Sequence, residues 1–272
     1  MTSGLPVRRA YLDVSGRQVH YRTAGKPGLP RLLLLHQSPS SSAMYQALME
    51  QLADRYQVFA PDTPGFGNSD TLPVAQHELQ IADYARAIHE FCSALGMTGC
   101  YVFGHHTGAA VAVQLEHDYP GTARAMVLSG PTLLTDEQKI ALPASVAALP
   151  ADEQGSHVQA MWQRLRDKDP QAPLSLTQRE LLSALACGES YLASYEAVTR
   201  QDFSGQLPTI ACPVLVFAGD QDPLHGAVQP TLALLQQGHT VDLPGGERTY
   251  VCERQADMVA AILHDFFNAS GS

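Results

Sequence analysis

The stretch CYVFGHHTGAAVAVQLEHDYP, residues 100–120, predicts a buried strand, a tight turn and a helix in direct succession. Its first residues are apolar, as in a strand with both faces buried, and small residues open the segment with helical character. Between them lies GHHTG, residues 104–108, in which two glycines enclose a pair of histidines. Glycines at such a turn let a strand and the following helix approach closely, so this turn is the first candidate for a functional site.

On both sides of this stretch, short apolar runs alternate with segments whose apolar residues recur at helical spacing. Residues 8–23 alternate apolar and polar side chains around Ser15-Gly16, which predicts an antiparallel hairpin. Residues 79–96 repeat apolar residues three and four apart and end at Gly96, a typical residue for a helix C-terminus. Alternation of strand and helix along most of the chain predicts an α/β fold, with a largely parallel sheet and helices on both faces.

The alternation stops between residues 132 and 206. This segment is polar and helical in pattern, contains several prolines, and shows no buried strand. We therefore expect one core built from residues 1–131 and 207–272, with residues 132–206 inserted as a helical cap. Such a cap lies over the carboxyl edge of the sheet, where open α/β sheets place their ligands.

Composition limits the classes of partner. Of the 272 residues, 45% are hydrophobic and 16% are charged, as in an ordinary globular enzyme. The net charge of −10 argues against nucleic acid as a partner. The N-terminal segment lacks the apolar core of a signal peptide and no run of eighteen apolar residues occurs, so we expect a cytoplasmic protein without a membrane partner. The pattern leaves open whether the chain is a monomer or a homodimer.

Five cysteines are spread along the chain without the spacing of a metal site, and we expect them to be reduced and mostly buried. They are Cys92, Cys100, Cys187, Cys212 and Cys252.

Four ordered motifs resemble those of the α/β-hydrolase fold family. LLLLHQSPSS at 32–41 is similar to the His-Gly loop after the third strand, and APDTPGFGNSD at 60–70 to the D-x-P-G-x-G-x-S loop. GHHTG occupies the place of the nucleophile elbow, and VLVFAGDQDPL at 214–224 resembles the segment that carries the catalytic acid. The resemblance covers nearly the whole chain outside the predicted cap. It implies an eight-stranded, mostly parallel sheet and hydrolase-type activity on a small molecule.

Carried over residue by residue, the resemblance puts His106 in the position of the nucleophilic serine. His105 fills the preceding position, where it is expected to pack under the turn. The second aspartate of GDQD, Asp222, matches the triad carboxylate, whereas Asp220 is interpreted as a turn former.

The family histidine does not carry over. Aligning LPGGERTYVCE, residues 243–253, on Glu253 places Arg248 where the histidine is expected. The resemblance therefore implies a catalytic set of His106, Asp222 and Arg248. In this set Arg248 would form an ion pair with Asp222 or hold the substrate.

Three functions are compatible with these residues. The first is hydrolysis of an ester, thioester or activated carbonyl, with His106 as nucleophile or general base. The second is lyase, decarboxylase, isomerase or cofactor-free oxygenase chemistry, in which His106 moves a proton while backbone donors stabilise an oxyanion. The third is binding of a small molecule without catalysis. By family analogy the oxyanion donors would be the N–H groups of Ser38 and Thr107, with the side-chain amide of Gln37 as a further candidate. None of the three requires an organic cofactor.

Several other side chains are candidates for the wall of the pocket. His36, His105, Trp162 and His225 are candidates to line the pocket. A metal site made by the two adjacent histidines, Asp222 and His225 is not expected, because neighbouring residues on a turn point in different directions.

Two features of the predicted cap have alternative interpretations. Its Met161, Tyr191 and Tyr195 either line the pocket or pack between cap and core. RLRDKD, residues 164–169, is interpreted as a solvated helix end rather than an anion site.

Overall fold

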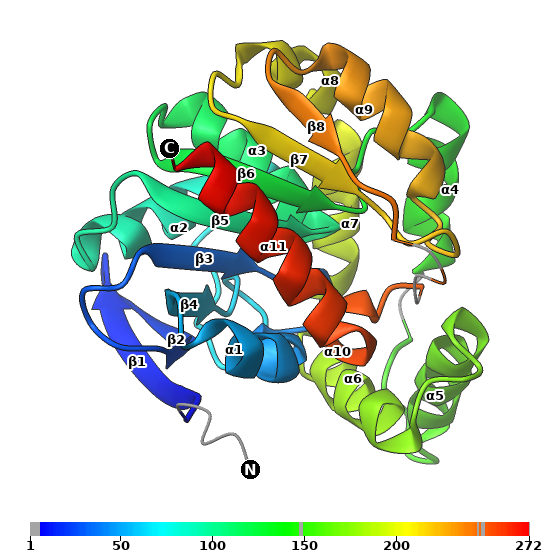
Figure 1. Ribbon diagram of the computed structural model, residues 1–272. Helices are drawn as coiled ribbons and strands as arrows, with labels where there is room; N and C mark the ends of the chain where they lie inside the picture. The colour runs from blue at the N-terminus through cyan, green and yellow to red at the C-terminus, as the bar shows by residue number, and fades with distance from the viewer. Residues whose placement is uncertain (1–5, 147–148, 244, 246–247, 272) are drawn as a thin grey trace.

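The computed structural model describes residues 6–146, 149–243, 245 and 248–271. Eight strands form one sheet in the order β1-β2-β4-β3-β5-β6-β7-β8 (Figure 1). The predicted α/β class and eight-stranded sheet are therefore confirmed. The strands are β1 (Arg8–Val14), β2 (Arg17–Ala24), β3 (Arg31–Leu35), β4 (Gln57–Pro61), β5 (Cys100–His105), β6 (Ala123–Ser129), β7 (Val214–Phe217) and β8 (Gly238–Thr240).

Helices connect most of these strands, and short 3-10 turns occur at loop ends. The α-helices are α1 (Gln46–Leu52), α2 (Ile81–Ala94), α3 (Thr107–Asp118), α4 (Asp136–Ser145), α5 (Ser156–Lys168), α6 (Leu174–Ala186), α7 (Ser190–Arg200), α8 (Phe203–Gln206), α9 (Val228–Leu234), α10 (Val251–Arg254) and α11 (Ala256–Ser270). The 3-10 turns are η1 (Ser42–Tyr45), η2 (Gln76–Glu78), η3 (Leu207–Thr209) and η4 (His225–Ala227).

Register in the sheet places the carboxyl ends of the central strands in one row. Strands β1, β2 and β4 pair antiparallel, and the remaining neighbours pair parallel. Gly104 of β5 lies beside Leu35 of β3, and His105 lies beside Ser129 of β6. Ser129 in turn pairs with Phe217 of β7. Loops that leave these four strands therefore start side by side at one edge of the sheet.

Two apolar cores sandwich the sheet. On one face α2 and α3 pack against it, with Phe91 fully buried among their side chains. On the other face α1, α10 and α11 cover the alternate residues of the same strands, and Phe267 is fully buried there (Figure 1). Burial on both faces explains why runs such as the four leucines of β3 are apolar without alternation. No helix in the described ranges is long and apolar enough to cross a membrane.

Between β6 and β7 the described residues form helices and no strand. We call α4 to α7 the inserted helices. They lie at the edge toward which the central parallel strands point (Figure 1).

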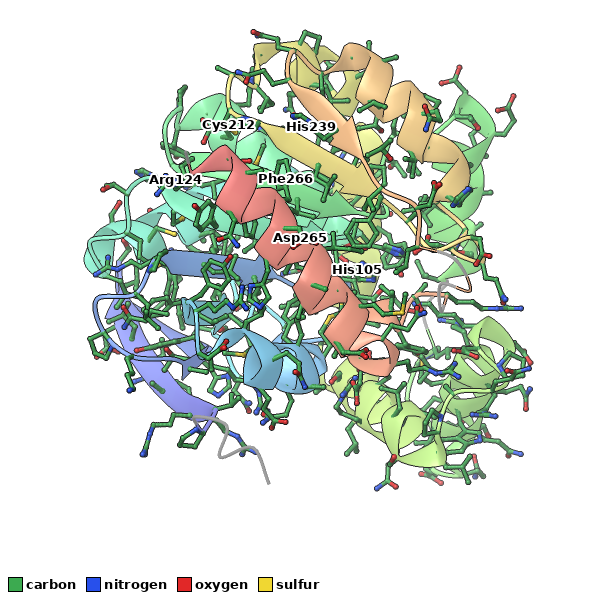
Figure 2. All side chains as sticks on the ribbon, viewed as in Figure 1. His105, Arg124, Cys212, His239, Asp265 and Phe266 are labelled. Carbon is green, nitrogen blue, oxygen red and sulfur yellow. The ribbon has the colours of Figure 1, made fainter. Side chains whose placement is uncertain are left out.

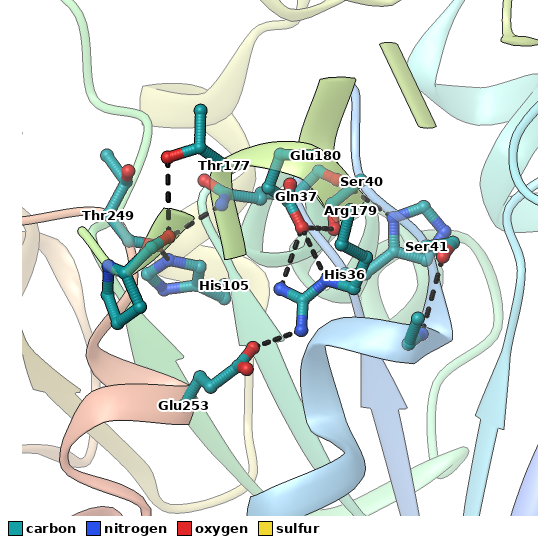
Figure 3. Close-up of polar contacts among 12 residues, drawn as sticks. His36, Gln37, Ser40, Ser41, His105, Thr177, Arg179, Glu180, Thr249 and Glu253 are labelled. Atoms are coloured by element: carbon teal, nitrogen blue, oxygen red, sulfur yellow. Dashed lines mark hydrogen bonds and ion pairs between the residues drawn. The ribbon is translucent and has the colours of Figure 1, made fainter. Parts of the chain in front are cut away.

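Ion pairs join the inserted helices to the rest of the chain. Arg179 of α6 binds the carboxylates of its neighbour Glu180 and of Glu253 on α10 (Figure 3). The hydroxyl of Ser40, in the loop after β3, donates to Glu180 over 3.2 Å. A second pair links Arg254 of α10 to the buried Asp169, which follows α5, at 3.0 Å.

Candidate active site

The turn between β5 and α3 holds His106 in an unusual backbone conformation. Its φ is 49° and its ψ is −113°, a region that non-glycine residues rarely adopt. A Cβ at Gly104 would overlap the backbone of Gly108, and a Cβ at Gly108 would overlap the carbonyl of Leu35 in β3. The two glycines therefore allow the strand and the helix to approach closely, and this close approach imposes the unusual φ and ψ angles of His106.

His106 and Asp222 form a close pair across the strand ends. The His106 Nε2 atom lies 2.7 Å from Oδ2 of Asp222, and the Asp222 side chain is only 1% exposed. The backbone N–H of Leu224 donates to the other carboxylate oxygen over 2.8 Å. Burial by itself would raise the pKa of Asp222, but the interactions with His106, His105 and the Leu224 N–H together outweigh burial, and the pKa is lowered. An ionised carboxylate can only accept here, so Nε2 carries the proton in the neutral ring and the lone pair is left on Nδ1.

Gly130, directly after β6, makes room for this pair. Its φ is 62°, and a Cβ built on it would lie 2.5 Å from Nε2 of His106 and closer still to Cδ2. The imidazole thus rests against the Gly130 backbone through its Cδ2–Nε2 bond. No hydrogen bond to Nδ1 occurs among the residues that the structure describes.

Arg248 does not occupy the place that the resemblance implied. It is exposed, and its guanidinium donates to the backbone carbonyl of Lys168 over 3.1 Å. The expected ion pair with Asp222 is replaced by the pair between Asp222 and His106. The next residue, Thr249, is buried and faces the site instead. Counting back from Glu253 therefore selected a residue beside the site, because the loop before α10 points Arg248 outward.

His105 is a fully buried structural residue. Its Nε2–H donates to the carbonyl of Thr249 over 3.1 Å (Figure 3). Its Nδ1 accepts from the hydroxyl of Ser129 over 3.0 Å. Burial, and to a lesser extent the neighbouring His106, lower its pKa to about 3. His105 is therefore neutral and holds the Thr249 backbone under the turn. Figure 2 shows its place in the interior of the molecule.

The buried neutral His105 predicts acid sensitivity. An unfolded chain protonates this histidine near pH 6.5, whereas the folded protein does so only near pH 3. The free energy of unfolding should be highest above pH 6.5 and should fall by about 2 kcal/mol by pH 5 from this residue alone. Urea unfolding at pH 7 and pH 5 measures the difference, which should shrink in His105→Gln. An equal loss in both proteins would contradict the assignment to His105. His36, whose pKa burial also lowers, accounts for a remaining slope of the same sign.

The loop after β3 contributes structural contacts rather than the expected side-chain donors. The Gln37 amide donates to the carbonyl of Thr249 over 3.1 Å, so it holds that segment and does not point at a ligand (Figure 3). His36 bridges the backbone, donating from Nδ1 to the Gln37 carbonyl and accepting at Nε2 from the N–H of Thr63. Neither side chain belongs to the described cavity lining, in contrast to the sequence-based expectation.

Two further candidates lie outside the described cavity wall. His225 Nδ1 is 3.1 Å from the backbone carbonyl of Gly219, so the ring is held by its own loop. Trp162 is partly buried and packs against the apolar core. Neither residue lines the cavity. Among the described residues, no group of three His, Cys, Asp or Glu side chains has metal-site geometry.

A cavity of about 420 Å³ opens above His106. This volume lies within the range of about 300–1,000 Å³ typical of small-molecule sites. The strand-end loops contribute its floor and the inserted helices its roof. Apolar side chains form most of the wall, and Tyr191 and Tyr195 belong to it, as one of the two interpretations anticipated. The lining is Ser38, His106, Thr107, Thr132, Leu134, Gln138, Ala141, Leu142, Ser145, Val146, Arg164, Leu165, Lys168, Tyr191, Tyr195, Val198, Pro223, Leu224 and Thr249.

Two backbone N–H groups border the cavity floor beside His106. Thr107 is the first residue of α3, where N–H groups have no partner within the helix. The N–H of Ser38 points toward the side-chain oxygen of Thr107 at the long distance of 3.4 Å. The carbonyl of Ser38 accepts from the hydroxyl of Tyr195 over 3.2 Å, which fixes this loop to α7.

A model of the alpha/beta hydrolase fold family matches residues 30–232, three quarters of the chain. The chain belongs to the α/β-hydrolase fold family. Among curated members, mouse epoxide hydrolase 4 (Mus musculus) is 31% identical over 106 residues, 39% of this chain and 29% of that protein. Haloalkane dehalogenase 2 of Mycobacterium bovis is 30% identical over 123 residues, 45% of this chain and 42% of that protein. The chain thus spans less than half the length of these curated relatives.

Solved structures extend the likeness of this α/β-hydrolase-fold chain to nearly its whole length. A putative lipase from Acinetobacter baumannii AYE superposes with a TM-score of 0.83 over 97% of this chain and 92% of that one. Their sequences are 17% identical, so the comparison establishes a shared fold.

Sequence reasoning missed three groups that the structure brings to the site of this family member. Gly130 and Thr249 contact the His106 region through backbone geometry that no motif reveals. Lys168 was included in a helix end interpreted as solvated, yet it lines the cavity together with Arg164. The signal was present in the spacing: positions 164 and 168 lie on the same face of α5 as the buried Leu165.

Proposed function

We propose that this protein is a hydrolase of small ester or thioester substrates in which His106 acts as the general base. The observation that carries the proposal is the 2.7 Å contact between His106 Nε2 and the buried Asp222 carboxylate, on the floor of a cavity of substrate size. A carboxylate behind an imidazole fixes the tautomer and stabilises the imidazolium that forms on proton uptake. In this pair His106 is the base that takes a proton from water, and Asp222 is the carboxylate that orients the ring.

The proposed reaction consumes one water molecule. Nδ1 of His106 takes a proton from water while the water oxygen bonds to the carbonyl carbon, giving a tetrahedral oxyanion and an imidazolium. Collapse of this intermediate breaks the bond to the alcohol or thiol leaving group. The imidazolium returns its proton to the leaving group, and the carboxylic acid and the alcohol or thiol are released.

The geometry favours a base over a direct nucleophile. Asp222 occupies Nε2, the ring nitrogen that lies farther from the backbone. The remaining nitrogen, Nδ1, stands next to the ring carbon that bears Cβ, so a carbonyl carbon would meet the backbone before it could bond. A water molecule is small enough to approach Nδ1 and to donate its proton.

The N–H groups of Thr107 and Ser38 are proposed as the oxyanion donors. The Thr107 N–H lies at the positive end of the twelve-residue helix α3, which favours negative charge at that place. Within the described ranges, the N–H of Ser38 makes one long contact, to the Thr107 side chain, and is available to bind a charged oxygen. Both border the same cavity as His106. Donors fixed before the reaction stabilise the developing charge without reorganisation.

The inserted helices are proposed to act as a cap over this site, with core residues 1–131 and 207–272 and cap residues 132–206. Their side chains form the roof of the cavity, and the ion pair between Arg179 and Glu253 ties them to α10. A roof over the site limits the contact of bulk water with it, which strengthens the electrostatic interactions there.

A panel of short-chain p-nitrophenyl esters and thioesters tests the proposal, with Gly130→Ala as the diagnostic variant. We expect the native protein to hydrolyse members of the panel. We expect Gly130→Ala to lose at least about 100-fold in kcat/KM, because the new Cβ pushes the imidazole away from Asp222. Gly99→Ala is the matched control: its φ of 56° imposes similar backbone strain, but no atom lies within 4 Å of the added Cβ.

Equal losses in the two glycine variants would show that strain, and not the displaced imidazole, is the cause. A native protein inert on the entire panel would end the hydrolase proposal. Proton-transfer chemistry on a carbonyl compound would then be the next candidate. The specific observation in its favour is that position 106 holds an imidazole, so no acyl-serine can form there.

A further inference from the structure

Lys168 brings a positive charge into the cavity that the proposed hydrolysis does not use. It ends α5 and lines the cavity together with His106. Only three lysines occur in the chain, and the net charge is −10. A lysine in this cavity is therefore not part of a generally basic surface.

The ammonium group of Lys168 is left without a strong partner. In the described part of the chain, Nζ makes no hydrogen bond and no ion pair; its recorded neighbour is the ring of Tyr250, with the centroid 5.7 Å away. Burial lowers the pKa of Lys168, while the more distant carboxylates of Glu180, Asp222 and Asp169 raise it. Lys168 is partly buried. A partly buried lysine without a direct counter-ion is stabilised by an anion that enters the same cavity.

A second cationic side chain stands one helical turn earlier. Arg164 lines the same cavity, and its guanidinium interacts with the side chain of Tyr191. Residues four apart on a helix share a face, so both cations are presented from α5 toward one side of the site. The remaining inserted helices contribute mainly apolar side chains such as Leu142 and Val198. The cavity therefore has a cationic wall on α5 and an apolar wall elsewhere.

We infer that the substrate carries a carboxylate, which Lys168 binds with support from Arg164 while the ester carbonyl lies at His106. The predicted substrate class is a half-ester or half-thioester of a dicarboxylic acid. This inference rests on the proposed function for the position of the carbonyl. The carboxylate site itself depends only on the cavity and its cations.

Two p-nitrophenyl esters of equal chain length test the inference. The adipate half-ester ends in a carboxylate, and the hexanoate ester ends in a methyl group. We expect the native protein to prefer the adipate half-ester by at least about tenfold in kcat/KM, through a lower KM. In Lys168→Met this preference should fall at least about tenfold. Lys139→Met on α4 is the control, because it removes a lysine of the inserted helices that does not line the cavity.

Lys168→Met lowering both esters by the same factor would overturn the inference, since Lys168 would then only balance the charge of nearby carboxylates. A native preference for hexanoate would overturn it as well. Calorimetric titration with adipate and hexanoate separates this inference from the proposed function. Adipate bound by the native protein and lost in Lys168→Met supports the carboxylate site even if every ester is inert. No binding of adipate by the native protein contradicts it.

Discussion

His106→Ala is expected to lower kcat/KM on any ester that the native protein hydrolyses by about 10²–10⁴-fold, the usual contribution of a positioned general base. The loss is expected because, among the described residues, His106 is the one histidine that both lines the cavity and contacts Asp222. The side chain is 13% exposed and its backbone bonds do not depend on the imidazole, so the fold should persist. Steady-state kinetics with a circular dichroism check measures the effect.

Two companion variants sharpen this test. Asp222→Asn preserves the shape of the acid but no longer fixes the proton on Nε2, so activity should also fall by about 100-fold or more. His106→Ser places the family nucleophile in the turn, yet it should stay inactive, because His105 is engaged with Ser129 and Thr249 and cannot activate it. Activity within tenfold of native in His106→Ala would exclude this residue as the base.

Arg179→Met is expected to lower the free energy of unfolding by about 3 kcal/mol. Glu180 is 3% exposed and depends on this guanidinium, which donates to it from Nε over 2.9 Å and from Nη2 over 2.7 Å. Without Arg179, the hydroxyl of Ser40 is the one hydrogen-bond partner that the buried carboxylate keeps among the described residues. The link from α6 to Glu253 on α10 is lost in the same step. Urea denaturation at pH 7 measures the change.

The control for this variant is an ion pair at the protein surface. Arg86 and Asp83 lie 2.8 Å apart on α2, with the arginine side chain 51% exposed, so Arg86→Met should cost less than about 1 kcal/mol. The double variant Arg179→Met with Glu180→Leu should lose less than Arg179→Met alone, because no buried carboxylate is stranded. Similar losses for Arg179→Met and Arg86→Met would show that the buried network contributes no more than a surface pair.

Much of the fold could be predicted because its signals are local. The apolar run of β5 followed by GHHTG predicted a strand, a turn and a helix, and the structure has β5 to His105 and α3 from Thr107. The polar, helical pattern of 132–206 matches the helices found between β6 and β7. Periodicity suffices in these cases because the apolar residues of each segment are buried against neighbouring elements of the fold.

The site was predicted only in part, because its contacts join segments far apart in the chain. His106 and Asp222 were both selected as catalytic candidates, but their contact spans 116 residues, and sequence spacing carries no information on that distance. Asp222 was instead assigned to Arg248, which lies one residue before the buried Thr249. A one-residue error in a loop exchanges an inward for an outward side chain. Lys168 was missed because a charged helix end has the same composition whether it faces water or a cavity.

The glycine contacts around the turn have a consequence for how this scaffold can change its chemistry. The contorted backbone at position 106 is held by the close approaches at Gly104 and Gly108, neither of which involves the side chain at 106. The backbone conformation of this turn therefore does not depend on which side chain stands at position 106, and that side chain borders the same cavity in each case. Substitution of His106 can place an alcohol, a thiol or a carboxylate at this position while the close contacts of Gly104 and Gly108 are kept. Related proteins that share this turn can therefore catalyse different reactions with the same fold.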